Sequence, residues 1–345
     1  MMASNTDIEQ TTTPKKAGPP FDDENADVIL RSSDKVDFHI QKIFLTTASG
    51  VFRDILGIPG SSASKPACTP SGNPIIMIDI TEHSKLLDSV LRFCHPAVVP
   101  PKLESLDDAY DLYRAADKYM LEAMKTWAKS YIESCVESNP AIVFAIACIE
   151  RWKDLIHKAA LATFKHTLSD LTQSQSRVLE KVPAAAMQRL WIFYERHRAE
   201  TLKSLSCDVI MRGVADARYE ATSPDYYGMD LPDPPEQPFY ASKKSECCLS
   251  SQHVYMSEDE ALLYVKKWWI TFMEDVQNAA TELPDVPSIL RESLYRRAVE
   301  EAGRCNTCGP VAYGQLVDYT RALRARASGD DPIMELKLDE AFRDI

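Results

Sequence analysis

The chain has 345 residues, a length typical of about two domains, and it is acidic, with 51 Asp and Glu, 39 Lys and Arg and a formal net charge of −12. Because nucleic-acid affinity depends on Lys and Arg that displace counterions, this balance disfavours DNA or RNA binding. Residues 1–19 contain no apolar segment typical of a secretory signal, and the longest apolar run, residues 141–149, is far shorter than the roughly 20 residues that span a membrane.

The nine cysteines are irregularly spaced, and two of them, Cys94 and Cys148, fall inside apolar patterns. An odd number of scattered cysteines is typical of reduced thiols and differs from a disulfide framework. We therefore expect a protein of the cytoplasm or the nucleus that neither spans a membrane nor binds nucleic acid.

The start of the chain predicts a tail and then a β-hairpin. Residues 1–20 are rich in Thr, Pro and Lys and predict a disordered tail. Residues 27–31 and 36–40 alternate apolar and polar side chains on either side of a short polar turn, which predicts two antiparallel strands.

Helical turns, a loop and a third strand are predicted next. Residues 43–56 have helical apolar spacing. Residues 57–74 are rich in Ser, Pro and Gly and predict a loop. Residues 75–80 form a β-branched apolar run of strand length.

Three helices complete this part of the chain. Thr81 can cap a helix whose apolar positions end at Cys94. Ser105, with Asp108 three residues later, predicts the start of the second helix. The third carries the apolar residues between 120 and 131.

Residues 139–345 predict an all-helical region with one irregular, proline-rich stretch at about 202–256. Pro140 suits the first position of a helix, where its missing N–H costs nothing. Ser257 with Glu260 predicts the cap of an aromatic helix whose Trp268-Trp269 pair is more typical of a core than of a binding hot spot. The other candidate helices cover residues 140–150, 152–168, 173–181, 183–200, 288–302 and 312–328.

Cys305 and Cys308 form the only CxxC of the sequence. Two thiolates at this spacing can hold two corners of a zinc tetrahedron. Further ligands could come from the irregular stretch, which contains Cys207, Cys247, Cys248 and His253. The zinc hypothesis assigns the site to Cys207, Cys248, Cys305 and Cys308; the alternative is a helix-breaking turn with two thiols. A redox CxxC is disfavoured because this one lies between helices.

Catalytic motifs are not evident. The histidines lack the HExxH spacing, there is no G-x-S-x-G, and 11 glycines leave little material for a phosphate-binding loop. We therefore predict a protein that is not an enzyme.

Three segments, in this order, resemble the BTB/POZ domain. Residues 26–30 resemble its opening strand, residues 38–56 its F-x-x-H-K-x-x-L-x-x-x-S-x-x-F segment, and residues 110–119 its helix that ends in A-x-K-Y/F. The resemblance covers residues 21–135 and implies an α+β domain with a short mixed sheet flanked by helices. A long acidic chain with a helical tail resembles the BTB proteins of fungi.

This resemblance implies protein–protein association. In the family, the first strand and helices of two chains often pack into a homodimer. Some transcriptional members have an Asp and a basic residue in a charged pocket at the dimer seam, and the matching residues are Asp27 and Lys42. The alternative is that Asp27 caps a strand end and Lys42 is a solvated charge. Gln41 stands where the family usually has His.

Other family members connect substrates to a cullin-3 type ubiquitin ligase, commonly through a hydrophobic-x-Glu motif in the loop after the helix pair. That loop, residues 57–74, contains no Glu here, which disfavours the adaptor. The helices predicted from residue 139 to 171 resemble the helical segment that follows BTB in adaptors and keep it open. An oligomerising scaffold is the leading hypothesis, with a cullin-3 adaptor and a zinc-binding module as alternatives.

Overall fold

The computed structural model describes most of the chain in two compact units. The N-terminal unit contains residues 1–136 and 176–180, and the C-terminal unit contains residues 137–175 and 181–345. The described residues are 14–57, 64–68, 74–205, 240–242, 248–256, 262–285, 289–327, 338 and 341–342. Among them, no helix is both long enough and apolar enough to cross a lipid bilayer.

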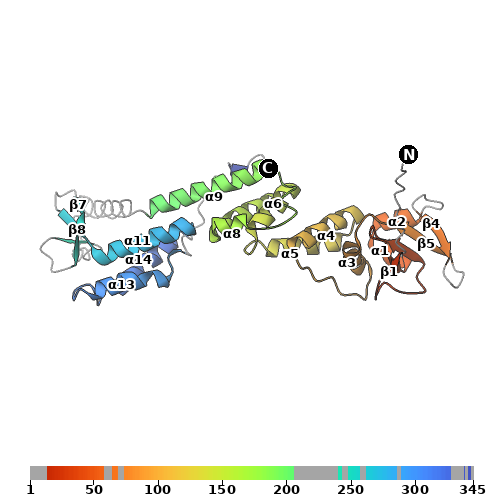
Figure 1. The fold of residues 1–345 in the computed structure, drawn as a ribbon, viewed down its shortest axis with the longest axis horizontal. Coiled ribbons are helices and arrows are strands. Elements are labelled where there is room, and N and C mark those ends of the chain that lie inside the picture. Colours follow the sequence, from red (N-terminus) through yellow and green to blue (C-terminus); the bar gives the residue numbers. More distant parts are fainter. Residues whose placement is uncertain are drawn as a thin grey trace, which may run out of the picture. The chain divides into compact units, whose positions relative to one another are not determined.

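A five-stranded mixed sheet lies at one end of the described N-terminal unit (Figure 1). Its strands are β1 (Lys15–Lys16), β2 (Val28–Arg31), β3 (Val36–Ile40), β4 (Ser64–Cys68) and β5 (Pro74–Asp79), in the order β1-β3-β2-β5-β4. The predicted hairpin of β2 and β3 is confirmed, with Leu30 opposite Phe38. β5 runs parallel to β2, so Leu30 also lies opposite Ile78. Parallel neighbours need a crossover connection, and the chain between them contains helices.

Two strands differ from the prediction. Residues 14–20 are not a disordered tail, because the Lys15 N–H donates to the Lys35 carbonyl at 2.9 Å and β1 pairs with β3. The predicted loop at 57–74 contains β4, which pairs with β5. Both strands lie at sheet edges. β1 is two lysines and β4 has Pro66 at its centre, so neither has the apolar alternation by which a strand is identified.

The helices of this unit are α1 (Lys42–Ala48), α2 (Gly50–Gly57), α3 (Ser84–Cys94), α4 (Leu106–Tyr119) and α5 (Glu122–Ser134). As predicted, the Ser105 hydroxyl caps α4 by accepting the Asp108 N–H at 3.1 Å. Thr81, however, does not cap α3. The helix begins three residues later, where the Ser84 N–H donates to the Asp34 carboxylate at 2.8 Å. A residue 50 positions away therefore satisfies this helix end.

The C-terminal unit is mostly helical, but it is not all-helical. Its helices are α6 (Pro140–Glu150), α7 (Lys153–Ala162), η1 (Thr163–Lys165), α8 (Leu168–Thr172), α9 (Ala184–Ser204), α11 (Lys267–Glu282), η3 (Glu292–Leu294), α13 (Tyr295–Gly303) and α14 (Ala312–Ala327). α6 has the predicted bounds and begins at Pro140. A three-stranded sheet, β6-β8-β7, contains β6 (Tyr240–Ser242), β7 (Leu249–Met256) and β8 (Leu262–Lys266).

Three predictions for this region need correction. The irregular stretch predicted at 202–256 contains the strands β6 and β7. Residues 262–266, predicted to belong to the aromatic helix, form the strand β8 instead. Residues 173–181 are not a helix. Ser176 donates instead to the Asp107 carboxylate at 2.7 Å, and this contact attaches the segment to the N-terminal unit. Ser257 and Glu260 lie outside the described residues.

The core of the C-terminal unit is rich in aromatic side chains. Trp268, Trp269 and Phe272 on α11 are fully buried, and the rings of Trp269 and Tyr319 meet edge to face at 4.7 Å. α11 packs against α13, which packs against α14, and β8 lies at the start of α11 (Figure 1). Both tryptophans therefore belong to the core, and neither is an exposed hot spot.

Candidate functional site

Two large apolar side chains lie exposed beside the α1–α2 helix pair. Ile43 on α1 is 64% exposed and Met120, at the end of α4, is 63% exposed. The Met120 sulfur lies 4.0 Å from the position that a side chain on Gly50 would occupy, at the first residue of α2. Each is a single exposed apolar side chain that a partner protein would have to cover to make an interface here.

Asp27 and Lys42, the predicted pocket residues, hold the two ends of this helix pair. The Asp27 carboxylate accepts the Lys42 N–H at 2.5 Å, at the first residue of α1. The Lys42 ammonium donates to the Leu56 carbonyl at 2.8 Å, in the last turn of α2. A carboxylate at a helix start and an ammonium at a helix end both complement the helix dipole. Asp27 is exposed and Lys42 is half-buried. Because both make hydrogen bonds within the helix pair, Asp27 does not simply cap a strand end and Lys42 is not simply a solvated charge.

Gln41, at the family's usual histidine position, connects α1 to the preceding loop. Its side-chain amide donates to the Asp23 carboxylate and to the Asn25 carbonyl, both at 3.0 Å. The Asn25 backbone N–H and then the Gln41 amide lower the pKa of Asp23. Glutamine therefore takes a hydrogen-bonding role that needs no imidazole.

A polar cluster joins the end of α4 to the start of the α3 region. The Glu82 side chain, only 10% exposed, accepts from Lys118 at 2.6 Å and from the Tyr119 hydroxyl at 2.5 Å. Burial raises the pKa of Glu82, but the hydrogen bonds from Lys118 and Tyr119 outweigh it, and the net pKa is lowered. Ser49, at the junction between α1 and α2, donates to the Tyr119 carbonyl at 2.6 Å and thereby connects this junction to the end of α4.

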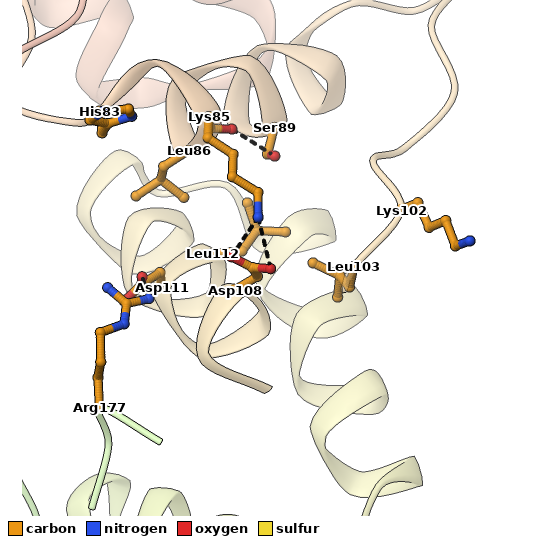
Figure 2. A pocket seen from close by; sticks show the side chains of 10 residues that line it. All are labelled: His83, Lys85, Leu86, Ser89, Lys102, Leu103, Asp108, Asp111, Leu112 and Arg177. Carbon is orange, nitrogen blue, oxygen red and sulfur yellow. Dashed lines mark hydrogen bonds and ion pairs between the residues drawn. The ribbon is translucent and has the colours of Figure 1, made fainter. Parts of the chain in front are cut away.

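A pocket of about 200 Å³ lies between α3 and α4. Figure 2 shows Lys85 reaching from α3 to Asp108 on α4, at 3.1 Å, while Lys102 extends away. Arg177, from the segment that returns to this unit, donates to Asp111 at 2.8 Å. Lys85 and Arg177 are thus paired with carboxylates, and the pocket offers neither of these charges unpaired to a ligand.

Three cysteines of the C-terminal unit form a cluster. The sulfur atoms of Cys248, Cys305 and Cys308 all lie within 4.8 Å of one another, and those of Cys248 and Cys308 are 3.7 Å apart. Cys305 and Cys308 lie in the turn between α13 and α14 and are 8% and 1% exposed. The structure therefore brings together three of the four predicted zinc ligands, while Cys207 lies outside the described residues.

Gly309 and backbone amides shape the thiol cluster. A Cβ at Gly309 would lie 3.3 Å from the Cys305 carbonyl, so the tight turn favours glycine. Burial raises the pKa of Cys305, but the backbone N–H groups of Cys308, Cys248 and Thr307 outweigh it and lower the pKa to about 6. Burial raises the pKa of Cys248 to about 12. This set of thiols could hold a metal ion.

A comparison with family models matches residues 20–135 to the BTB/POZ domain. This part of the chain is a BTB/POZ domain. A search among curated proteins finds no match to the chain. The BTB domain is typically a non-enzymatic interaction domain, so the match supports protein binding.

The BTB/POZ match covers the A-x-K-Y motif but not the CxxC motif. The A-x-K-Y motif of the BTB domain supplies Lys118 and Tyr119 to the polar cluster around Glu82. Nothing in the sequence singles out Glu82, because no local pattern connects it to Lys118 and Tyr119 at the end of α4. The thiol cluster lies beyond residue 135, outside the matched segment.

Proposed function

We propose that this chain is a non-enzymatic scaffold that forms a homodimer through its BTB domain and brings a protein partner to its C-terminal unit. The observation that carries the proposal is the BTB/POZ match over residues 20–135. The exposed Ile43 supports it, because that side chain lies on one of the helices by which family members commonly pair.

The contacts around α1 make Ile43 suited to an interface. Asp27 and Lys42 connect the two ends of the α1–α2 pair, so the position of Ile43 is set before a partner binds. Preorganisation of this kind lowers the entropy cost of association. Burial of an exposed Ile side chain stabilises a complex by about 1.5–3 kcal/mol.

The substitution Ile43→Asp tests the homodimer directly. We expect light scattering at micromolar concentration to give a dimer mass for the wild type and a monomer mass for Ile43→Asp, because a carboxylate would be buried without a partner. Val99→Asp is the matched control, since Val99 is also exposed and lies after α3. Circular dichroism checks that each variant is folded. A monomer mass for the wild type would remove homodimerisation from the proposal.

The charged pocket assigned to Asp27 and Lys42 depends on this homodimer and stays a prediction. Their hydrogen bonds hold both residues at the α1–α2 helix pair, which is where the proposed dimer seam would lie. A structure of the dimer would test it by showing whether the two side chains line the seam.

A cullin-3 adaptor is the second candidate function. It is supported by α6 and α7, which pack together directly after the BTB domain. Pull-down with the purified N-terminal domain of cullin-3 tests it, with Ile43→Asp as a comparison that separates dimerisation from cullin binding. The absence of any binding by the wild-type protein would end this hypothesis and would leave the homodimer proposal unaffected.

A further inference from the structure

The thiol cluster is not explained by the BTB domain. Cys248 comes directly before β7, whereas Cys305 and Cys308 lie 57 and 60 residues later in the turn between α13 and α14. The three sulfur atoms nevertheless lie within 4.8 Å of one another. Convergence of thiols from separate segments is typical of a metal centre or a disulfide.

The distance between the sulfur atoms favours the metal. Cys248 and Cys308 are 3.7 Å apart, whereas a disulfide joins its sulfur atoms at about 2.05 Å. In a tetrahedral zinc site with Zn–S bonds of about 2.3 Å, two sulfur ligands lie about 3.8 Å apart. The 3.7 Å between the sulfur atoms of Cys248 and Cys308 is therefore compatible with two ligands on one zinc ion.

We propose that Cys248, Cys305 and Cys308 bind one structural Zn²⁺ ion. Thiolates are soft ligands that select zinc over Mg²⁺ or Ca²⁺. Each thiol loses its proton to solvent when its sulfur binds the metal. The three thiolates fill three of the four positions of a tetrahedral zinc ion, and the burial of Cys305 and Cys308 disfavours a catalytic role.

A metal ion at the thiol cluster would connect the β6–β8 sheet to the helices α13 and α14. The Cys248 carbonyl accepts the Lys267 N–H at 3.0 Å, at the start of α11, so Cys248 is already attached to β8 and α11. Cys305 and Cys308 belong to the same aromatic core, in the turn after α13. Zinc would therefore link the small sheet to the α13–α14 helix pair.

Metal analysis of the full chain, purified under reducing conditions without chelator, tests the proposal. We expect about one zinc per chain, and a loss of zinc of at least about tenfold in Cys248→Ser, Cys305→Ser and Cys308→Ser. Cys135→Ser is the matched control, because Cys135 is a half-buried thiol of the BTB domain, and it should retain wild-type zinc. Zinc below about a tenth of an equivalent in the wild type would overturn the proposal.

A second measurement keeps the proposal testable if the serine variants unfold. The wild-type protein is stripped with chelator and reductant and then titrated with Zn²⁺ or Co²⁺. We expect Co²⁺ to produce the thiolate charge-transfer absorbance of a tetrahedral site, and Zn²⁺ to protect the three cluster thiols from alkylation as mapped by peptide mass spectrometry. A zinc-free protein with a Cys248–Cys308 disulfide, or alkylation that zinc does not change, would contradict it.

Discussion

Two kinds of distant contact can be compared between the units, a polar one in the N-terminal (BTB) unit and an aromatic one in the C-terminal unit. In the BTB unit, single polar side chains join segments far apart in sequence, as Ser49 does with the Tyr119 carbonyl and Asp34 with Ser84. In the C-terminal unit, aromatic rings pack together at α11, with Trp269 and Phe272 around Tyr319. Polar contacts are sensitive to protonation and can be removed singly, whereas a packed core responds to volume. The polar contacts of the BTB unit and the packed rings around α11 should therefore respond to different perturbations.

The largest expected effect is on the aromatic core. Trp269→Ala should lower the free energy of unfolding of the C-terminal unit by about 3–5 kcal/mol, because it removes a buried ring and leaves a cavity. Calorimetry of the full chain should show one transition shifted and the BTB transition unchanged. Trp191→Ala, at a half-buried position of α9, should cost less. Equal shifts of both transitions would show that the units do not unfold separately.

A pH-dependent effect is expected in the BTB unit, at Glu82. Its pKa in the folded protein is lower than the ordinary value of 4.5. The carboxylate therefore stabilises the fold fully above that value, and this contribution is lost as the pH falls through the folded pKa. Glu82→Gln should lower the unfolding free energy by about 1 kcal/mol at neutral pH.

Urea unfolding from about pH 7 to about pH 3 measures this difference. The gap between wild type and Glu82→Gln should narrow as the solution becomes more acidic. Glu104→Gln is the control, because the Glu104 side chain is 71% exposed and its loss should matter little. A gap that widens on acidification would contradict the assigned sign.

The smallest expected effect compares one helix end in each unit. Met120 ends α4 and Arg151 ends α6, and both have the left-handed backbone conformation, with φ of 53° and 58°. Glycine adopts this conformation without the penalty that other residues have. Met120→Gly and Arg151→Gly should each raise the unfolding free energy of their own unit by up to about 1 kcal/mol. Thermal denaturation measures both, and a loss of stability at either would show that the side chain contributes more than the backbone strain costs.

Local patterns were sufficient for much of the fold. The alternation in residues 27–40 predicts the β2–β3 hairpin, and Ser105 and Pro140 predict the starts of α4 and α6. The CxxC motif predicts two members of the thiol cluster, and the assignment of Cys248 as a third agrees with its position. In each helix or strand the signal lies within a few residues of the element that it specifies.

The sequence by itself therefore determined the BTB domain, the hairpin and the main helices, because capping, alternation and turn chemistry act between neighbours. Only the tertiary structure decided that β1 and β4 are strands, that Asp34 satisfies the start of α3, and that residues 176–180 return to the BTB unit. It also decided that Cys248 reaches Cys308. These contacts join residues far apart in the chain, and no local pattern specifies which distant partner a sheet edge, a helix end or a thiol will meet.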